Sequence, residues 1–396
     1  MAPPSSHVQK TTFMKRYGMS NRSREENRGV VDAIVVGGGL AGALVARELA
    51  EQRLRVRVLD PSPPDSPQKA ARVGALYIKP GVDYTPETRF AHQAFDYATR
   101  RYRELQRPWR QRRFWQSTGT LQLAWNERER RRQNKLLALN SYRSDFIQSV
   151  SADEAARLSG LPLGRGGLWF PRGGVVAIAS LRAAVLTHPN IQFEQTSLAS
   201  GPEQSRSGDW FIKTENGRPL QTSVLIFATG AATGRWFPEL PIQSIRGQVS
   251  CFASSGDRPL CAISGGGYAL PPTNGLQTVG ATFDHGSDDD SVRDDSHSAN
   301  LQSLRNWLPE LGERYQPEDI KTGWTGFRST SPDHLPVAGQ LRGLHVIAGL
   351  GGKGLAYAPI LARLLAESVR GRPGTLDADL VARVAPQRLL SDAKGC

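Results

Sequence analysis

Three glycines near the start of the chain have the spacing of a phosphate-binding turn. Gly37, Gly39 and Gly42 form the pattern G-x-G-x-x-G, whose bare backbone lets a pyrophosphate approach the N–H groups at a helix N-terminus. The pattern alone is weak evidence, because a glycine-rich turn can match it by chance. Its value depends on the elements that surround it.

Those elements have the order that the motif requires. The apolar, β-branched stretch Val31–Val36 predicts a strand before the glycines, and the amphipathic run Leu44–Gln52 predicts a helix after them. A second strand is predicted at Arg55–Leu59, and Asp60 ends it, about 20 residues after the first glycine. A carboxylate there accepts hydrogen bonds from a ribose and repels a 2′-phosphate. We therefore predict that these glycines and Asp60 bind a dinucleotide.

Two later turns decide which dinucleotide is favoured. Thr229 and Gly230 follow a predicted strand at Val224–Ala228, and the glycine-rich turn Gly349–Gly354 joins a predicted strand, Leu344–Ala348, to a helix. Bare amides at a helix N-terminus suit a flavin, because reduction places negative charge on its pyrimidine ring. Each turn alone is as consistent with an ordinary helix entry. Together they favour FAD over NAD.

The charge balance favours a polyanionic partner. The 396 residues include 50 Lys and Arg against 37 Asp and Glu, a formal net charge of +13. Two segments concentrate the arginines: Arg100, Arg101, Arg103, Arg107, Arg110, Arg112 and Arg113 among Tyr102, Trp109, Phe114 and Trp115, and then Arg128, Arg130, Arg131, Arg132 and Lys135. We predict that the arginines contact RNA, whereas each aromatic side chain, taken singly, fits the core better. The acidic run Asp288–Asp290 repels RNA and is expected away from that face.

Local patterns predict helices in the middle of the chain. A charged run predicts one at Glu127–Leu139, and Ser151 with Glu154 three residues later predicts a capping box at the start of another. A third helix is expected at Ser180–Leu186, with its serine as the cap.

The order of the elements predicts the fold class. A strand–helix–strand unit opens the chain, antiparallel strands and turns run from Ile245 to Thr282, and a strand–helix unit closes it. This order indicates a Rossmann-like α/β domain interrupted by an α+β domain with an antiparallel sheet. We assign residues 1–30 to a disordered basic tail. Residues 31–90, 165–238 and 329–386 form the dinucleotide domain, and residues 91–164 and 239–328 form a substrate- and RNA-facing domain.

Several classes of protein and site are disfavoured. No stretch approaches the roughly 18 apolar residues of a membrane span. The seven histidines and three cysteines show no metal-ligand spacing. The polar segment Met1–Asn27 lacks the apolar core of a signal peptide. We expect no membrane and no metal, and a location in the cytoplasm.

Further strings of residues carry a specific resemblance. They are Val73–Tyr77, Gly119–Leu123, Arg246–Ser250, Gly267-Tyr268, Gly280–Gly286, Gly326–Arg328, Asp333–Gly339 and Gly349–Leu355. With the glycine motif, they resemble the D-amino-acid-oxidase/glycine-oxidase superfamily of FAD enzymes. Within it, the chain is most similar to the C-terminal oxidoreductase domain of the bifunctional tRNA wobble-uridine modification enzymes of the MnmC family.

The resemblance implies a reaction and its cofactor. The implied activity is FAD-dependent removal of the carboxymethyl group from 5-carboxymethylaminomethyl-(2-thio)uridine at the tRNA wobble position. Hydride leaves the glycine methylene, and hydrolysis of the resulting imine gives glyoxylate and the 5-aminomethyl nucleoside. The implied partner is the tRNA anticodon loop. Because Met1–Gly29 is too short for the methyltransferase domain of that family, we expect a separate methyltransferase to act on the product.

The resemblance also implies roles for single residues. Arg328 matches the arginine that binds the substrate carboxylate, and its neighbours Trp324 and Phe327 are not those of a solvated arginine. Tyr268 is a candidate for a second carboxylate or lid contact, with a core tyrosine nearly as consistent. Asp333 and His334 fit a turn acid and a packed histidine better than a catalytic pair. The implied flavin contacts are Gly74, Ala75, Leu76, Thr229, Gly230, Gly349, Gly351, Gly352, Lys353, Gly354 and Leu355.

Two alternatives remain open. An FAD-dependent oxidase of glycine, sarcosine or a D-amino acid shares the fold and the Arg328 clamp but has little use for the arginine clusters. A non-catalytic RNA-binding flavoprotein keeps the fold without the reaction. Salt-sensitive tRNA binding and bleaching of the flavin by tRNA distinguish these alternatives.

Overall fold

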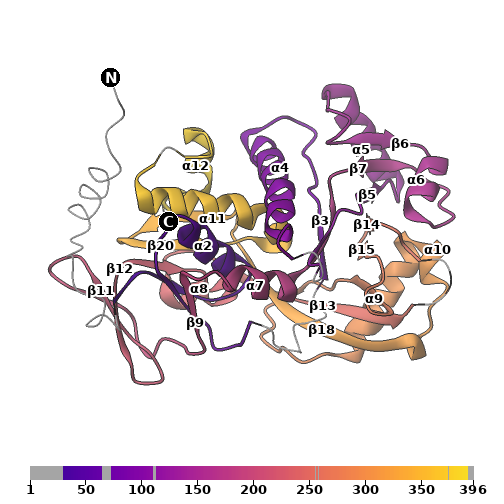
Figure 1. The fold of residues 1–396 in the computed structure, drawn as a ribbon. Helices are drawn as coiled ribbons and strands as arrows, with labels where there is room; N and C mark the ends of the chain where they lie inside the picture. Colours follow the sequence, from indigo (N-terminus) through magenta and orange to yellow (C-terminus); the bar gives the residue numbers. More distant parts are fainter. Residues whose placement is uncertain are drawn as a thin grey trace, which may run out of the picture.

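The computed structural model describes residues 30–64, 73–109, 113–254, 256, 258–372 and 374–390. The predicted tail up to Gly29, together with Arg110 and Arg112 of the first arginine segment, lies outside the described residues. Figure 1 shows two β-sheet regions at opposite ends of the molecule, with helix α4 (Pro86–Gln106) and strand β3 (Val73–Leu76) between them.

The first region is built on an eight-stranded sheet with a parallel centre. In spatial order, the parallel strands are β9 (Ile191–Glu194), β2 (Val56–Leu59), β1 (Val30–Val36), β12 (Pro219–Phe227) and β20 (Leu344–Ala348). The antiparallel strands β10 (Glu203–Gln204), β11 (Trp210–Lys213) and β19 (Val337–Leu341) complete it.

Apolar side chains cover both faces of this sheet, as the unbroken apolar strands predict. On β1, Ala33 and Val35 join the core that contains α2 (Leu40–Glu51), α4 and α11 (Gly354–Arg370), whereas Ile34 and Val36 join the core on the other face. Tyr102 of α4 fixes the helices against one another, because its buried hydroxyl donates to the carbonyl of Leu355 at 2.8 Å.

The second region contains a mostly antiparallel, nine-stranded sheet. Its path is β17 (Asp284–His285), β13 (Gln243–Ala253), β16 (Leu276–Gly280), β15 (Tyr268–Ala269), β14 (Ala262–Ser264), β5 (Thr120–Leu123), β7 (Gly167–Phe170) and β6 (Gln148–Val150), and β18 (Ile320–Thr330) pairs with β13. The helices of this region are α5 (Glu127–Leu139), α6 (Ala152–Ser159), α9 (Asp294–Trp307) and α10 (Pro309–Gly312).

A small sheet joins the two regions. Strand β8 (Gly174–Ala177) pairs with β3 on one side and with β4 (Trp115–Gln116) on the other. Helix α7 (Ile178–Leu186) follows β8 directly, and α8 (Thr233–Trp236) and α12 (Ala378–Val384) complete the described helices of the α-type.

The predicted fold class, an α/β region interleaved with an antiparallel sheet, is confirmed. Helix α5 and strand β20 begin and end at the predicted residues, and Ser151 with Glu154 forms the predicted capping box on α6. The predicted serine cap on α7 is wrong, since that helix begins at Ile178 and has no side-chain cap.

The predicted domain limits stay a prediction, and one of them cuts through paired strands. The limit at residue 165 assigns Gly167–Phe170 to the dinucleotide domain, yet this strand, β7, pairs with β5 and β6 in the nine-stranded sheet. Within the described part of the chain, no helix is long and apolar enough to cross a membrane, and no three His, Cys, Asp or Glu side chains gather as a metal site would require.

Candidate active site

The turn between β1 and α2 has the close contacts that the glycine motif predicts. Gly37 has a φ of +97°, and a Cβ there would collide with the carbonyl oxygen of Ala228. A Cβ on Gly42 would collide with the carbonyl oxygen of Gly37, so this glycine lets the helix pack on the turn. By contrast, no atom lies within 4 Å of a Cβ built on Gly39. Two of the glycines therefore shape the turn, and the third leaves space in front of it.

The open space in front of Gly39 lies at a helix N-terminus, where backbone N–H groups are hydrogen-bond donors. Helix α2 begins at Leu40 with Gly39 as its N-cap, and its first turn has neither a capping side chain nor an acidic residue. The N–H groups of such a turn lack helical partners and carry the positive end of the helix dipole. An anionic group fits this position.

Asp60 lies at the same turn. One of its carboxylate oxygens accepts from the N–H of Gly38 at 2.7 Å, and the other accepts from the N–H of Ser62 at 2.8 Å. These bonds fix the carboxylate where β2 ends, beside the glycines. Each oxygen keeps a further lone pair, so the position remains suited to the hydroxyls of a ribose.

Arg182 of α7 is a member of this site that the sequence did not reveal. It is 4% exposed, and its Nε donates to the carbonyl of Gly38 at 2.5 Å. Its Nη2 is buried and has no hydrogen-bond partner among the described residues. Burial lowers the pKa of Arg182, and the nearby charge of Asp60 opposes that shift. An unpartnered buried cation beside an open turn is the environment that an anionic ligand completes.

The second glycine turn also presents open backbone. Gly349 and Gly351 have φ values of +67° and +53°, and nothing lies within 4 Å of a Cβ built on Gly351 or Gly352. Helix α11 starts at Gly354 without a side-chain cap. Lys353 is exposed, with its ammonium 5.6 Å from the ring centre of Tyr357.

The turn at Thr229 and Gly230 is similar. It opens a short 3₁₀ turn (Gly230–Ala232), Gly230 has a φ of +57°, and a Cβ on Gly230 would meet no atom within 4 Å. The hydroxyl of Thr229 lies 3.2 Å from that of Thr233. The turn at Thr229 and Gly230 and the turn Gly349–Gly354 therefore both leave backbone uncovered.

The three predicted contacts on β3 differ in burial, because Gly74 and Ala75 are half-buried and Leu76 is fully buried. Leu76 lies in the helix core, and its carbonyl accepts from the hydroxyl of Thr120 at 3.2 Å. A Cβ on Gly74 would come within 2.7 Å of the Leu355 side chain, which places β3 against the start of α11. Ala75 packs toward Tyr268 on the edge of a separate apolar cluster.

Arg328 lies on β18, where the two regions meet. Its Nη1 donates to the carbonyl of Thr282 at 3.1 Å, and its guanidinium carbon lies 4.1 Å from the ring centre of Phe283. A Cβ on Gly247 would overlap the guanidinium, so this glycine supplies the room in which it rests. Burial lowers the pKa of Arg328, and the opposing charges of Tyr268, Tyr77 and Asp284 partly offset that effect.

Two tyrosines accompany this arginine. Burial raises the pKa of Tyr268 and of Tyr77, although the charge of Arg328 acts to lower both. Both phenols therefore stay protonated at neutral pH and are donors as well as acceptors. Tyr268 was predicted for this site, whereas Tyr77 was only part of the string after Gly74. Three donors of this kind suit a carboxylate.

A backbone link joins the arginine to the second glycine turn. The N–H of Gly349 donates to the hydroxyl of Ser329 at 3.1 Å, and Thr330 forms an antiparallel bridge with Leu350. Arg328 is thus the residue directly before Ser329, which bonds the end of β18 to the turn. Arg328 and the turn are therefore neighbours in space.

Asp333 and His334 do not join this group. Asp333 is bound by Arg388 at 2.8 Å and by the hydroxyl of Ser331 at 2.7 Å. Burial tends to raise the pKa of Asp333, but these bonds lower it overall. His334 is exposed with a φ of +58°. The predicted turn acid is confirmed, while His334 is a surface residue of the turn and not a packed one.

Comparison with known proteins now decides the family. A profile of the family described as FAD dependent oxidoreductase (DAO) matches residues 32–368. The chain belongs to this FAD-dependent oxidoreductase family. The solved structure of glycine oxidase from Geobacillus kaustophilus is similar to this member at a TM-score of 0.74 with 22% identity, over 89% of this chain and 98% of that one.

Curated relatives resemble this flavoenzyme more closely in sequence. Proteins named tRNA 5-methylaminomethyl-2-thiouridine biosynthesis bifunctional protein MnmC, from Marinobacter nauticus and Hahella chejuensis, are 34% and 35% identical to it over 375 and 378 residues. The alignments cover 90% of this chain but only 58% and 59% of those proteins. The chain thus spans somewhat more than half the length of the relatives it matches.

FAD, the cofactor of the family, fits the residues present. The open turn at Gly39, the uncapped start of α2 and the unpartnered Nη2 of Arg182 suit its pyrophosphate. Asp60 suits its ribose, and the uncovered backbone at Gly351–Lys353 suits the oxygens of its flavin ring. A Cβ built on Gly354 would lie 3.9 Å from the side chain of Leu40, so the helices that follow the two turns start close together.

The arginine segments of the flavoenzyme divide into paired and unpaired members. Arg101 forms ion pairs with Glu48 and Glu51, and Arg132 binds Glu129 at 2.6 Å and the carbonyl of Pro80. Arg130 and Arg131 both pair with Glu127 on the surface. Tyr102, Phe114 and Trp115 are buried in the core, as predicted for single aromatics. The prediction that all these arginines contact RNA is thus weakened for Arg101 and Arg132.

Three arginines of the first segment, Arg103, Arg107 and Arg113, line a groove. It has a volume of about 830 Å³, lies where α4 ends and β4 begins, and is lined by Arg103, Gln106, Arg107, Arg113, Trp115, Gln116, Ser117 and Thr118. No acidic side chain is among the described residues that line it, and the three arginines are exposed. The groove is therefore cationic, with amide and hydroxyl donors beside the charges.

Proposed function

We propose that this FAD-dependent oxidoreductase removes the carboxymethyl group from 5-carboxymethylaminomethyl-(2-thio)uridine at the wobble position of tRNA. The net reaction consumes one water and transfers two electrons to the cofactor, leaving the 5-aminomethyl nucleoside and glyoxylate. The observation that carries the proposal is the 34–35% identity, over 90% of the chain, to proteins named for this tRNA modification. A cytoplasmic location and a methyltransferase acting on the product amine belong to the same proposal.

The cluster around Arg328 supports a glycine-type substrate. A guanidinium binds a carboxylate through two parallel N–H···O bonds, and among the described residues Arg328 donates only from Nη1, to Thr282. The hydroxyls of Tyr268 and Tyr77 add neutral donors. When bound, FAD would supply the acceptor for a hydride from the carbon beside the substrate amine. The task of the three side chains is to hold the carboxylate so that this carbon is correctly placed.

The cationic groove supports an RNA substrate. Phosphates spaced along a nucleic acid strand satisfy several cations at once, and removing one of those cations lowers the salt dependence of binding. Arg103, Arg107 and Arg113 present such a row of charges, with Trp115 and hydroxyl groups beside them. We propose that this groove, and not all the arginines of the two segments, contacts the anticodon arm.

The test of the reaction is mass analysis of wobble nucleosides after the FAD-loaded protein is incubated with tRNA that carries the carboxymethyl group. We expect conversion to the aminomethyl nucleoside with release of glyoxylate, and bleaching of the flavin when oxygen is absent. Bleaching by glycine or sarcosine, with no change in the tRNA, would instead establish the small-molecule oxidase that the glycine oxidase fold and the Arg328 clamp also allow. Binding of tRNA without bleaching would establish a non-catalytic flavoprotein.

The test of the groove is a matched pair of variants. Replacing Arg103, Arg107 and Arg113 by Gln should weaken tRNA binding and reduce the slope of log affinity against log salt by about one for each phosphate that the protein no longer neutralises. Replacing Arg130 and Arg131 by Gln removes exposed charges that already pair with Glu127. Because the first set removes three charges and the second removes two, equal effects per charge removed would show that only net charge matters and that tRNA does not lie in the groove.

A further inference from the structure

An aromatic ring at the surface touches the clamp arginine. Phe283 is 62% exposed, and its ring centre lies 4.1 Å from the guanidinium carbon of Arg328. Exposed apolar side chains are common on proteins, so exposure alone means little. The contact matters because it places a flat, accessible ring directly beside the group that we propose binds the substrate carboxylate.

The backbone before this ring is fixed to the central strands. The N–H of Thr282 donates to the carbonyl of Gln248 at 3.1 Å, and its hydroxyl accepts from the N–H of Gln248 at 3.0 Å. Its carbonyl accepts from Arg328 at 3.1 Å. Thr282 therefore uses both its backbone groups and its side chain to hold the position of the next residue.

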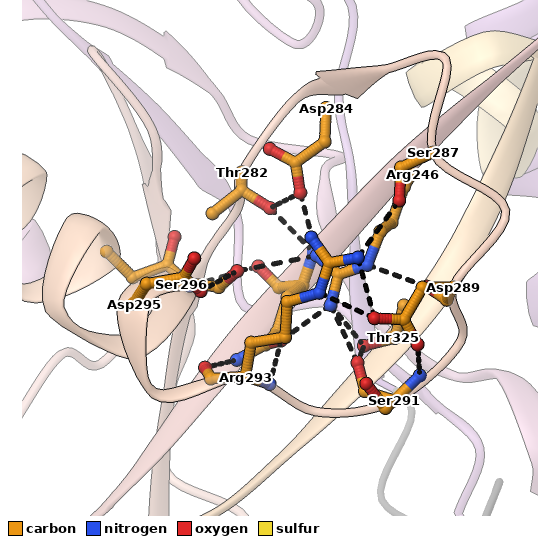
Figure 2. A network of polar contacts seen from close by, with 12 residues as sticks. Arg246, Thr282, Asp284, Ser287, Asp289, Ser291, Arg293, Asp295, Ser296 and Thr325 are labelled. Atoms are coloured by element: carbon orange, nitrogen blue, oxygen red, sulfur yellow. Dashed lines mark hydrogen bonds and ion pairs between the residues drawn. The ribbon is translucent and has the colours of Figure 1, made fainter.

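The backbone after the ring is fixed as firmly. Asp284 pairs with Arg246 in the β13–β17 ladder, and its carboxylate accepts from Arg246 Nη1 at 2.7 Å. Figure 2 shows how Arg246, which is 0% exposed, also donates to the backbone carbonyls of Asp289 and Ser291 in the loop that follows. The acidic run Asp288–Asp290 is thus attached to the sheet. An exposed ring on so rigid a segment loses little conformational entropy when a ligand covers it.

The geometry points to Phe283 as the platform on which the base of the substrate stacks. This inference rests on the proposed function, because free glycine and sarcosine have no ring to place there. In the proposed substrate, a single methylene separates the pyrimidine ring from the nitrogen of the glycine unit. A carboxylate held in the plane of the Arg328 N–H groups therefore leaves the pyrimidine close to the aromatic side chain that contacts Arg328. Base–aromatic stacking tolerates any base and needs no hydrogen bond.

The experiment compares two carboxylates that differ only in an aromatic ring. The probes are (benzylthio)acetate and (methylthio)acetate, in which sulfur replaces the amine nitrogen so that the compounds bind without being oxidised. Their dissociation constants are measured on the FAD-loaded protein from the change in flavin absorbance. The variants are Phe283→Leu, which keeps an apolar side chain but removes the ring, and Phe283→Tyr, which keeps the ring. Phe211→Leu is the control, because Phe211 is 45% exposed on β11 of the other sheet.

We expect Phe283→Leu to weaken (benzylthio)acetate about tenfold and to leave (methylthio)acetate within about twofold. Phe283→Tyr and Phe211→Leu should bind both probes as the wild type does. An equal loss for both probes would overturn the inference, since Phe283 would then serve only to position Arg328. No loss for either probe would overturn it as well. Failure of the proposed function is seen separately, as wild-type protein that leaves the wobble nucleoside of tRNA unchanged.

Discussion

Arg246 and Arg328 occupy almost the same place in the fold and differ in nearly everything else. They lie on the paired strands β13 and β18, where Arg246 is opposite Phe327 and Arg328 is opposite Ile245. Because adjacent positions of a ladder face opposite sides of a sheet, the two guanidinium groups point to different surroundings. All three nitrogens of Arg246 donate to protein acceptors, whereas within the described part of the chain Arg328 has one bond, from Nη1 to Thr282.

The difference separates a structural arginine from a binding one. A buried cation whose donors are all used holds segments together and has nothing left for a ligand. A half-buried cation with unused donors has lost part of its hydration without full replacement, so an anion completes it. The number of donors used by the protein, and not the charge itself, shows which arginines of this basic chain are available for a ligand.

The largest expected effect comes from Arg328→Met. Removing the guanidinium takes away the paired N–H groups for the carboxylate, so kcat/KM should fall by about a thousandfold or more, while the flavin spectrum and the unfolding free energy stay close to wild type. Steady-state kinetics and urea unfolding measure the two properties. Arg328→Lys should restore only a small part, because an ammonium lacks the planar fork. Wild-type turnover in either variant would assign the clamp to another residue.

The matched substitution Arg246→Met should show the reverse pattern. It leaves Asp284 and several carbonyls without their donor, which is expected to cost about 3–5 kcal/mol of unfolding free energy. Urea unfolding measures the loss. Any fall in activity should appear mainly at temperatures where the variant begins to unfold. A stable Arg246→Met protein with a defective carboxylate site would mean that the two arginines act as one unit.

A subtler substitution tests the space around Arg328. Gly247→Ala places a methyl group where the guanidinium now lies, and a displacement of about 1 Å is expected to lower kcat/KM roughly a hundredfold. Dissociation constants for (methylthio)acetate should rise in parallel, with FAD still bound. Gly201→Ala is the control, since nothing lies within 4 Å of a Cβ there. Wild-type behaviour of both alanine variants would contradict the prediction, because Arg328 could then move away from a methyl group at position 247 without loss of activity.

The smallest effect is expected on helix α5. There all three side-chain nitrogens of Arg132 donate to protein acceptors, as those of Arg246 do. Burial raises the pKa of Glu129, but hydrogen bonds and ion pairs with Arg132 and Lys79 outweigh it and lower the pKa to about 2 from its ordinary 4.5. The folded pKa is below the unfolded one, so the pairing stabilises the protein above pH 4.5 and the effect is lost as the pH falls from 4.5 to about 2.

The variant Glu129→Gln measures that contribution. Its unfolding free energy should be lower than that of wild type by on the order of 1–3 kcal/mol at neutral pH, and the gap should close as the pH falls through this window. Urea unfolding at a series of pH values gives the curve. A gap that is independent of pH would assign the loss to packing instead of to the ion pairs.

Much of the fold was predictable because local patterns specify it. The unbroken apolar strands around Gly37–Gly42 and Leu344–Ala348 predict a sheet buried on both faces, and the capping box at Ser151 marks the start of a helix. The prediction of the α7 cap failed because the helix follows β8 directly and begins at Ile178, so that Ser180 lies inside its first turn.

The site was less predictable because its members come from distant segments. Arg182 contacts the turn at Gly38 from α7, and Tyr77, from a distant part of the sequence, lies close enough to Arg328 for the arginine charge to influence its pKa. Arg101 pairs with Glu48 and Glu51 of α2 in addition to its local partner Glu104, and no local pattern predicts the pairs with α2. Sequence shows which residue types are present, and only the fold shows which donors are already used.

The bond from Gly349 to the hydroxyl of Ser329 has a consequence for how the two ligands influence each other. In the proposed function this turn contacts the flavin ring, and the strand bonded to it carries Arg328, the proposed anchor for the carboxylate. When one ligand orders the turn, the bond to Ser329 also orders the position at which the other ligand binds. By thermodynamic linkage, FAD and the carboxylate then each raise the affinity of the protein for the other by the same factor. Protein without FAD should therefore bind the carboxylate weakly, even though every side chain that is proposed to hold it is present.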